Sequence, residues 1–240
     1  MTEPLVFLPG MMCDSRLFEI QTRFLSLDRA VTVAPITLGE RIEEIASNLL
    51  QQLPHRFALL GLSMGGIVAM EILRRAPDRV TRLALMDTDP LADTPQIAAA
   101  RESLIVSARA GRLEDAVNGV IRSDILAPGP GRPAVLALVR QMSHELGPDV
   151  FVKQMRALQR RRDQQATLRR IKVPTMVMCG VHDTLTPVKR HSFMAELIPN
   201  AQLRMIEEAG HLPPLEQPMM TLDAIRDWLR QPLVLRGAVG

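Results

Sequence analysis

Residues 57 to 70 read Phe-Ala-Leu-Leu-Gly-Leu-Ser-Met-Gly-Gly-Ile-Val-Ala-Met, so an apolar run meets a Gly-x-Ser-x-Gly sequence and passes directly into a helical pattern. Gly61 and Gly65 indicate a turn between strand and helix that is too tight for side chains at those two positions. Ser63 then stands at the apex of the turn, with its hydroxyl above the carboxyl end of the strand and the next backbone N–H near the start of the helix. The segment therefore predicts an exposed nucleophile beside donors for an oxyanion.

Short apolar runs with the length and composition of fully buried strands recur along the chain. They are Leu5–Leu8, Ala30–Ala34, Phe57–Leu60, Leu83–Met86, Thr175–Cys179 and Gln202–Ile206. Helical spacing of apolar residues occurs between them, as at residues 42–53 and 67–73. Because strand and helix alternate, the pattern predicts an α/β protein with a mostly parallel six-stranded sheet flanked by helices on both faces.

The alternation stops between residues 90 and 170, where four helical patterns follow one another without a strand pattern. Glycine and proline separate these patterns at residue 111, at residues 128–131 and at residues 147–148. The segment also differs in charge, because its 13 basic and 8 acidic side chains give it a net charge of +5. We therefore expect an all-helical cap insertion at 90–170, within a core made of residues 1–89 and 171–240.

Composition excludes several other classes of protein. With 240 residues, 47% of them hydrophobic and 23% charged, the chain is neither disordered nor collagen-like. Its apolar runs are too short for a membrane span, which needs about 20 residues, and its first residues lack the basic and apolar regions of a signal peptide. We therefore expect a cytoplasmic protein with no membrane span.

The sequence offers no metal, cofactor or nucleic-acid signature. Cys13 and Cys179 are the only cysteines, and they form no CxxC or Cys/His cluster, which favours reduced thiols and no structural zinc. The glycine-rich motifs of nucleotide and dinucleotide sites and the HExxH motif are missing. A net charge of +3 is too slight to indicate nucleic-acid binding. We expect no cofactor, no metal and no nucleic-acid partner.

A serine hydroxyl needs a base to take its proton, and the base needs an orienting acid. His211 follows the last predicted strand, in a loop that would lie over the carboxyl edge of the sheet. Asp183 lies just past the end of the preceding strand and is the candidate acid, although its position also suits a helix N-cap. Asp87, at the end of an earlier strand, is its rival. The other histidines expected on solvated helices or turns are His55, His144 and His191.

Together these residues resemble the α/β-hydrolase family, and the resemblance extends over nearly the whole chain. Ser63, Asp183 and His211 occur in that family's order. The matching pieces are Gly61 to Gly65 as the nucleophile elbow, Gly180 to Asp183 followed by Pro187, and Gly210-His211 followed by Pro214 and Pro218. The helical insertion matches the cap domain that the family places at the same point. The resemblance implies a Ser-His-Asp hydrolase that works through an acyl-enzyme intermediate.

The chain departs from the family's pattern in two places. Members usually carry His-Gly after the first long strand, where one oxyanion donor lies, and this chain has Pro9-Gly10-Met11. By position in the family, the oxyanion donors would be the backbone N–H groups of Met11 and Met64. The chain also reaches its first strand almost at once, so the antiparallel hairpin that often opens the fold is missing or much reduced and six parallel strands remain.

The function we expect is hydrolysis of a carboxylic ester or thioester, with a small or medium acyl substrate held beneath the cap. Fold and triad leave open other reactions of the same residues, namely acyl transfer, C–C bond hydrolysis and lyase chemistry. Outside catalysis, the alternative is a ligand receptor that keeps this fold without turnover.

Basic side chains gather on one predicted helix of the insertion. Arg156 and Arg160 fall on one face of this helix, with Lys153 nearby. The simpler interpretation is a solvated helix face in an arginine-rich protein. The sharper hypothesis is that this face docks an acidic partner, such as an acyl carrier protein that delivers the ester or thioester.

Overall fold

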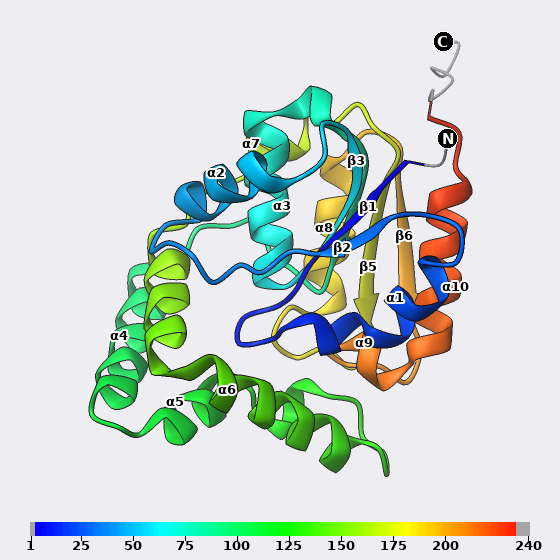
Figure 1. The fold of residues 1–240 in the computed structure, drawn as a ribbon. Helices are drawn as coiled ribbons and strands as arrows, with labels where there is room; N and C mark the ends of the chain where they lie inside the picture. Colours follow the sequence, from blue (N-terminus) through cyan, green and yellow to red (C-terminus); the bar gives the residue numbers. More distant parts are fainter. Residues whose placement is uncertain (1–2, 234–240) are drawn as a thin grey trace.

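The structure, a computed structural model, describes residues 3–233, and its six strands form one sheet in which all neighbouring strands are parallel. The strand order is β2-β1-β3-β4-β5-β6 (Figure 1). In chain order the strands are β1 (Leu5–Leu8), β2 (Val31–Val33), β3 (Phe57–Leu62), β4 (Val80–Met86), β5 (Thr175–Gly180) and β6 (Ala201–Ile206). The prediction of a six-stranded parallel sheet is confirmed.

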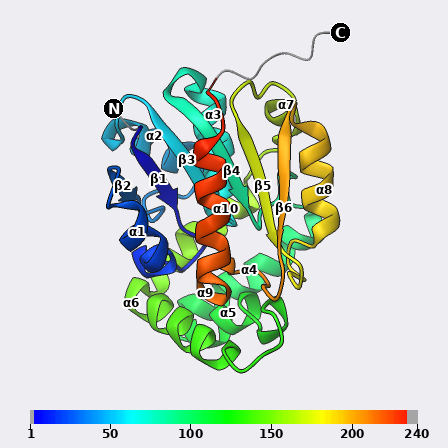
Figure 2. The same cartoon turned by 90° about the vertical axis from the view of Figure 1, so that its right-hand side faces the viewer.

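Helices cover both faces of this sheet (Figures 1 and 2). One face carries α2 (Ile42–Gln52), α3 (Met64–Arg75) and α8 (Val188–Leu197), and the other carries α1 (Glu19–Leu25) and α10 (Pro218–Arg230). Alternate residues of β1 serve the two sides, because Val6 and Leu8 join the first apolar cluster while Leu5 and Phe7 join the second. A strand buried on both faces needs an uninterrupted apolar sequence, which explains why β1, β3, β4 and β5 could be predicted from the sequence. The expectation of full burial is wrong for β2 and β6, because these strands form the two edges of the sheet and are partly exposed.

Short helices complete the core: η1 (Ser15–Phe18), η2 (Pro77–Arg79) and α9 (Pro213–Glu216). Within residues 3–233, no helix is both long and apolar enough to cross a membrane.

The segment between β4 and β5 is all-helical, as the fold prediction required. Its helices are α4 (Pro95–Arg109), α5 (Leu113–Val120), η3 (Ser123–Ile125), α6 (Arg132–Gln159) and α7 (Gln165–Leu168). Figure 1 shows α4, α5 and α6 gathered beyond the end of the sheet towards which β5 points. One predicted break is a kink rather than a helix end, because α6 continues through Gly147, whose φ is 79°, into a second half that begins at Pro148.

The two ends of this insertion lie side by side against the core. The backbone N–H of Gln164 donates to the carbonyl oxygen of Pro90 at 2.8 Å, which joins the exit of the insertion to its entry. The side-chain amide of Gln164 donates to the buried Glu71 of α3 at 2.9 Å. Nearby, Arg161 pairs with Asp93 at 3.0 Å. These contacts fix the junction between insertion and core, whereas the domain boundaries at 90 and 170 stay a prediction.

Candidate active site

Ser63 lies between β3 and α3 with φ 53° and ψ −117°, a conformation that residues other than glycine seldom adopt. The turn around it brings backbone against backbone. A Cβ atom on Gly61 would lie 2.2 Å from the carbonyl oxygen of Gly65, and one on Gly65 would lie 2.2 Å from that of Leu8. Both positions therefore exclude any side chain. Strain of the kind seen at Ser63 is concentrated at functional sites.

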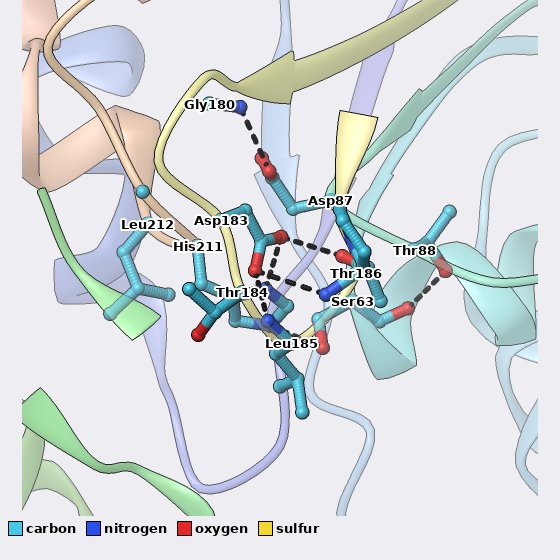
Figure 3. A network of polar contacts seen from close by, with 12 residues as sticks. Ser63, Asp87, Thr88, Gly180, Asp183, Thr184, Leu185, Thr186, His211 and Leu212 are labelled. Carbon is cyan, nitrogen blue, oxygen red and sulfur yellow. Dashed lines mark hydrogen bonds and ion pairs between the residues drawn. The ribbon is translucent and has the colours of Figure 1, made fainter. Parts of the chain in front are cut away.

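A continuous chain of hydrogen-bonding groups runs from Ser63 through His211 to Asp183 (Figure 3). The Oγ of Ser63 lies 2.9 Å from Nε2 of His211, and Nδ1 of that ring lies 2.8 Å from Oδ2 of Asp183. Beside an ionised carboxylate Nδ1 carries the proton, so Nε2 is free to accept the hydroxyl proton. The backbone N–H of His211 donates to the carbonyl oxygen of Ile125 at 2.8 Å, which holds the loop in place. This arrangement suits activation of a serine by a general base.

Asp183 is buried, and hydrogen bonds reach both of its carboxylate oxygens. Its Oδ1 accepts the backbone N–H groups of Leu185 at 2.8 Å and Thr186 at 3.0 Å, while the Thr186 hydroxyl donates to Oδ2 at 2.6 Å (Figure 3). Burial alone would raise the pKa of Asp183, but the His211 ring and the Thr186 donors outweigh it and lower this pKa to about 2. Asp183 is therefore ionised at neutral pH.

Asp87, the rival acid, is fully buried after β4 with a φ of 43°. Its Oδ1 accepts the backbone N–H of Gly180 at 2.9 Å. Burial and the nearby charge of Asp183 raise the pKa of Asp87 well above its usual range. A carboxyl group with a raised pKa is a weaker partner for a charged imidazole, and Nδ1 of His211 already lies 2.8 Å from Oδ2 of Asp183, so Asp183 is favoured as the partner of His211.

Asp87, Asp183 and His211 also offer one potential metal-ligand atom each, and these atoms lie within 4.8 Å of one another. A metal ion bound there would have to replace the hydrogen bond between His211 and Asp183. It would also have to act against the raised pKa of Asp87, because metal ligands bind in their deprotonated forms. The donor set therefore fits a hydrogen-bonded chain better than a metal centre.

The two predicted oxyanion donors, the backbone N–H groups of Met11 and Met64, belong to buried residues. Met64 is the first residue of α3, so the helix itself supplies no acceptor for its N–H. Met11 lies in a four-residue turn in which the N–H of Cys13 donates to the carbonyl oxygen of Gly10 at 3.2 Å. Neither N–H is hydrogen-bonded to another group within residues 3–233. Buried backbone donors without partners are rare, so both are available to an oxyanion.

A small cavity of about 30 Å³ opens beside Ser63, and its wall is mostly apolar. The insertion contributes Val120, Ile121, Ile125 and Val139, while the core contributes residues that include Met11, Cys13, Leu185 and Leu212. A substrate carbonyl bound at Ser63 would therefore be enclosed by side chains from both parts of the chain.

Cys13 and Cys179 are both free and buried, in agreement with the expected reduced thiols. Burial raises the pKa of each thiol to about 12. Neither cysteine can therefore compete with Ser63 as a nucleophile at neutral pH, although Cys13 lines the cavity.

Two buried polar residues that were not predicted to belong to the site support the turn at Ser63. The Thr88 hydroxyl donates to the carbonyl oxygen of Ser63 at 2.7 Å (Figure 3), and the Thr88 backbone N–H donates to Nε2 of His191 at 3.1 Å. The expectation that His191 is solvated is wrong, because it is fully buried, and burial lowers its pKa to about 4. The burial of His191 could have been predicted from its position three residues before the apolar Met194, because residues three apart lie on the same face of a helix, here α8.

The comparison with family models decides the classification. Residues 36–218 match the model described as alpha/beta hydrolase fold. The chain belongs to the α/β-hydrolase family. The resemblance drawn from the nucleophile elbow and from the order of the three site residues is thereby confirmed.

Relatives within the α/β-hydrolase family carry names of hydrolytic enzymes. The pimeloyl-[acyl-carrier protein] methyl ester esterase of Aromatoleum aromaticum is 28% identical over 204 residues, which cover 80% of this chain and 81% of that protein. The putative carbamate hydrolase RutD of Yersinia enterocolitica is 26% identical over 184 residues, which cover 73% of this chain and 63% of that protein.

Solved α/β-hydrolase structures also match. A thermophilic esterase from Thermogutta terrifontis matches with a TM-score of 0.86 and 28% identity, covering 95% of this chain and 89% of that one. The enol-lactonase from Burkholderia xenovorans matches with a TM-score of 0.84 and 22% identity, covering 96% and 92%, and this second likeness concerns the fold alone.

Proposed function

We propose that this α/β-hydrolase cleaves a carboxylic ester or thioester of a small to medium acyl substrate. The observation that carries the proposal is the hydrogen-bonded chain from Ser63 through His211 to Asp183, beside an apolar cavity. In this proposal Ser63 is the nucleophile, His211 is the general base and acid, and Asp183 orients His211 and balances its charge. The mechanism invokes no metal and no cofactor.

The acylation step begins at the Ser63 hydroxyl. As Oγ attacks the carbonyl carbon of the substrate, Nε2 of His211, 2.9 Å away, takes the hydroxyl proton. The resulting imidazolium lies against the ionised Asp183, which stabilises its charge. Collapse of the tetrahedral intermediate breaks the bond to the leaving group, and His211 returns the proton to that alcohol or thiol.

The second half of the reaction repeats these steps with water. His211 takes a proton from water, the hydroxide oxygen attacks the acyl-enzyme, and Ser63 leaves with the proton restored. In both halves the carbonyl oxygen gains negative charge, which the backbone N–H groups of Met11 and Met64 would stabilise. One such donor contributes roughly 10²- to 10³-fold to kcat in enzymes of this type.

We propose that the group bound next to Ser63 is small. The cavity of about 30 Å³ is far below the roughly 300–1,000 Å³ of pockets that enclose a whole small molecule. A methyl group or the first atoms of an acyl chain fit such a volume, and a longer chain would extend along the insertion. Relatives named pimeloyl-[acyl-carrier protein] methyl ester esterases support a small alcohol as the leaving group.

Those same names support the finer proposal that the acyl chain is carried by an acidic carrier protein. We also propose that the protein is cytoplasmic. The contacts of Arg156 and Arg160 differ, and this difference bears on which of the two could bind such a partner. Arg156 makes two hydrogen bonds to the carboxylate of Glu102, so its charge is compensated within the insertion. Arg160 is exposed, and its ion pair with the exposed Glu40 is longer, at 3.7 Å, and includes no hydrogen bond. Arg160 is therefore the better candidate for an acidic surface.

The test of the esterase activity is a panel of methyl, ethyl and nitrophenyl esters and of thioesters with graded acyl length. We expect saturable turnover, a burst of one leaving group per chain with activated esters, and the highest kcat/KM for small alcohol groups. The matched controls are Ser63→Ala, which should abolish the burst, and Ser26→Ala, an exposed serine outside the site, which should retain it. Binding of esters without any turnover would instead indicate a receptor.

The test of the carrier compares kcat/KM for a carrier-linked methyl ester and for the free methyl ester, at low and high salt. Electrostatic docking weakens with ionic strength, because the screening length is about 10 Å at 0.1 M salt. Arg160→Glu should lower only the carrier-linked rate, whereas Arg230→Glu, which changes an exposed side chain at the end of α10 outside the insertion, should change neither rate. If salt and Arg160→Glu change kcat/KM equally for the carrier-linked and the free methyl ester, the carrier proposal is wrong and the enzyme acts on free esters.

A further inference from the structure

The turn that carries Met11 contains a residue in an unfavourable backbone conformation. Residues 10–13 form this turn, closed by the hydrogen bond from the N–H of Cys13 to the carbonyl oxygen of Gly10. Met12 occupies its third position with a φ of 55°. A positive φ at this position is usual for glycine and costs energy for other residues. Something outside the turn must therefore hold Met12 in place.

Gln154, on the second half of α6, makes the contact that does so. Its Oε1 accepts the backbone N–H of Met12 at 2.9 Å, and its Nε2 donates to the carbonyl oxygen of Ile36 at 3.3 Å. Gln154 is fully buried, as is Met12. One side chain of the insertion thus binds the loop after β1 and the loop after β2 together, where no water competes.

The bond to Met12 selects one form of the turn. The N–H of the third residue belongs to the central peptide unit, and rotating that unit by half a turn interconverts the forms with positive and negative φ at the third position. With its N–H directed at Gln154, Met12 keeps the form with positive φ.

The first half of α6 contacts the same loop. The Ser143 hydroxyl lies 3.4 Å from the carbonyl oxygen of Met12, and the backbone N–H of Asp14 lies 3.4 Å from the sulfur of Met142. The helix therefore contacts both backbone groups of Met12 and one of Asp14. None of these contacts involves Ser63, His211 or Asp183.

Met11 shares this turn and lines the cavity beside Ser63, and its N–H is not hydrogen-bonded to any group of residues 3–233. We propose that Gln154 is a positioning residue that holds the Met11 N–H in the oxyanion site, so that docking of α6 on the loop sets the competence of the oxyanion hole. This inference rests on the proposed function. It assigns to one residue of the insertion an effect on the rate of the chemical step, beyond enclosing the substrate.

The test compares Gln154→Leu with Gln164→Leu. Gln164 is a matched control, because it is the same residue type, is equally buried and binds Glu71 at the junction of insertion and core, without contact to the loop of Met12. Gln154→Leu should lower kcat for a good ester about 10- to 100-fold, a part of the effect of losing one oxyanion donor, with little change in KM. Gln164→Leu should lose thermal stability to a similar extent and keep its kcat.

Gln154→Glu is the conservative variant. Burial favours the protonated form of a glutamate, which can accept from the N–H of Met12 and donate to the carbonyl oxygen of Ile36 as the amide does. It should recover most of the kcat that Gln154→Leu loses. Equal kcat values for Gln154→Leu and Gln164→Leu, both folded by circular dichroism, would overturn the proposal.

The rate at which a fluorophosphonate labels Ser63 separates this inference from the proposed function. Labelling uses the oxyanion site without depending on the natural acyl or leaving group. If the unmodified protein is not labelled at Ser63, the proposed function fails. If it is labelled, slow labelling of Gln154→Leu alone supports the positioning role, and equal rates in all variants contradict it.

Discussion

The Nε2 atom of His211 lies 2.9 Å from the Oγ atom of Ser63, although the two residues are 148 positions apart in sequence. The fold joins them because Ser63 follows β3 and His211 follows β6, and parallel strands end at one edge of the sheet. The loop that carries His211 also packs closely on the end of β5, since a Cβ atom on Gly180 would lie 2.0 Å from the carbonyl oxygen of Gly210. The insertion completes the contact, because Ile125 accepts the N–H of His211.

Replacing each of the two neighbouring acids by asparagine should lower kcat to very different extents. Asp183→Asn should lower kcat about 10⁴-fold, because an amide favours the wrong tautomer of His211. Asp87→Asn should cost less than about tenfold, because an amide oxygen can also accept the backbone N–H of Gly180 and asparagine tolerates a positive φ. Steady-state kinetics on one activated ester checks both variants. A larger loss for Asp87→Asn would move the catalytic acid to the end of β4.

A methyl group at the elbow should not be tolerated. Gly61→Ala places a Cβ atom 2.2 Å from the carbonyl oxygen of Gly65, so backbone has to move, and we expect a loss of about 3 kcal/mol or more of folding free energy together with activity. Gly129→Ala is the matched control, because its Cβ would meet no atom within 4 Å. That variant should change stability by less than about 0.5 kcal/mol in urea unfolding. Similar behaviour of the two variants would contradict the packing described for β3 and α3.

Acid should destabilise the protein partly through Glu71. Burial would raise its pKa, but hydrogen bonds from Arg74, Arg75 and Gln164 outweigh burial and lower the pKa from 4.5 to about 2. Because the pKa of Glu71 is lower in the folded state than in the unfolded state, the ionised carboxylate stabilises the fold above pH 4.5. This stabilisation is lost as the pH falls towards 2. Glu71→Gln should therefore be less stable by about 3 kcal/mol at pH 7, and the difference should shrink in that pH range.

Urea unfolding of Glu71→Gln at several pH values measures this linkage. Asp223→Asn, which changes an exposed carboxylate on α10, provides the control and should follow the unmodified protein at every pH. A stability difference for Glu71→Gln that is constant from pH 7 to pH 2.5 would contradict the assignment.

Chelation should leave ester hydrolysis unchanged. One potential ligand atom from each of Asp87, Asp183 and His211 lies within 4.8 Å of the others, but His211 and Asp183 are already hydrogen-bonded to each other. Prolonged dialysis against EDTA, followed by added zinc or magnesium, checks this expectation. Activity that disappears on dialysis and returns with the metal would replace the hydrogen-bonded chain with a metal centre.

Local pattern was sufficient to predict the strands and the elbow from the sequence. Buried parallel strands are continuous apolar runs, and the glycines on either side of Ser63 mark a turn without room for side chains. The same logic placed Asp183 and His211 beyond strand ends, and the structure puts their side chains within hydrogen-bonding distance of each other. Their catalytic roles stay predictions.

The contacts that hold the site in shape could not be predicted in this way. Gln154 lies on a helix 142 positions from Met12, and a glutamine carries no local signal for the partner it will bind. His191 was misjudged because burial of a helix face depends on what packs against it. The pairing of Arg156 could not be predicted for the same reason, since its partner, Glu102, lies on a different helix, 54 positions away.

The most direct test of the central claim is to identify the residue that reacts. The protein is treated with an organophosphonate, and its intact mass is measured by mass spectrometry. The protein is then digested, and its peptides are sequenced by mass spectrometry. We expect one mass equivalent, located on Ser63, with no labelling of Ser63→Ala and a kcat for that variant lowered about 10⁴-fold or more. Labelling of another residue while Ser63 stays unmodified in an active enzyme would contradict the account.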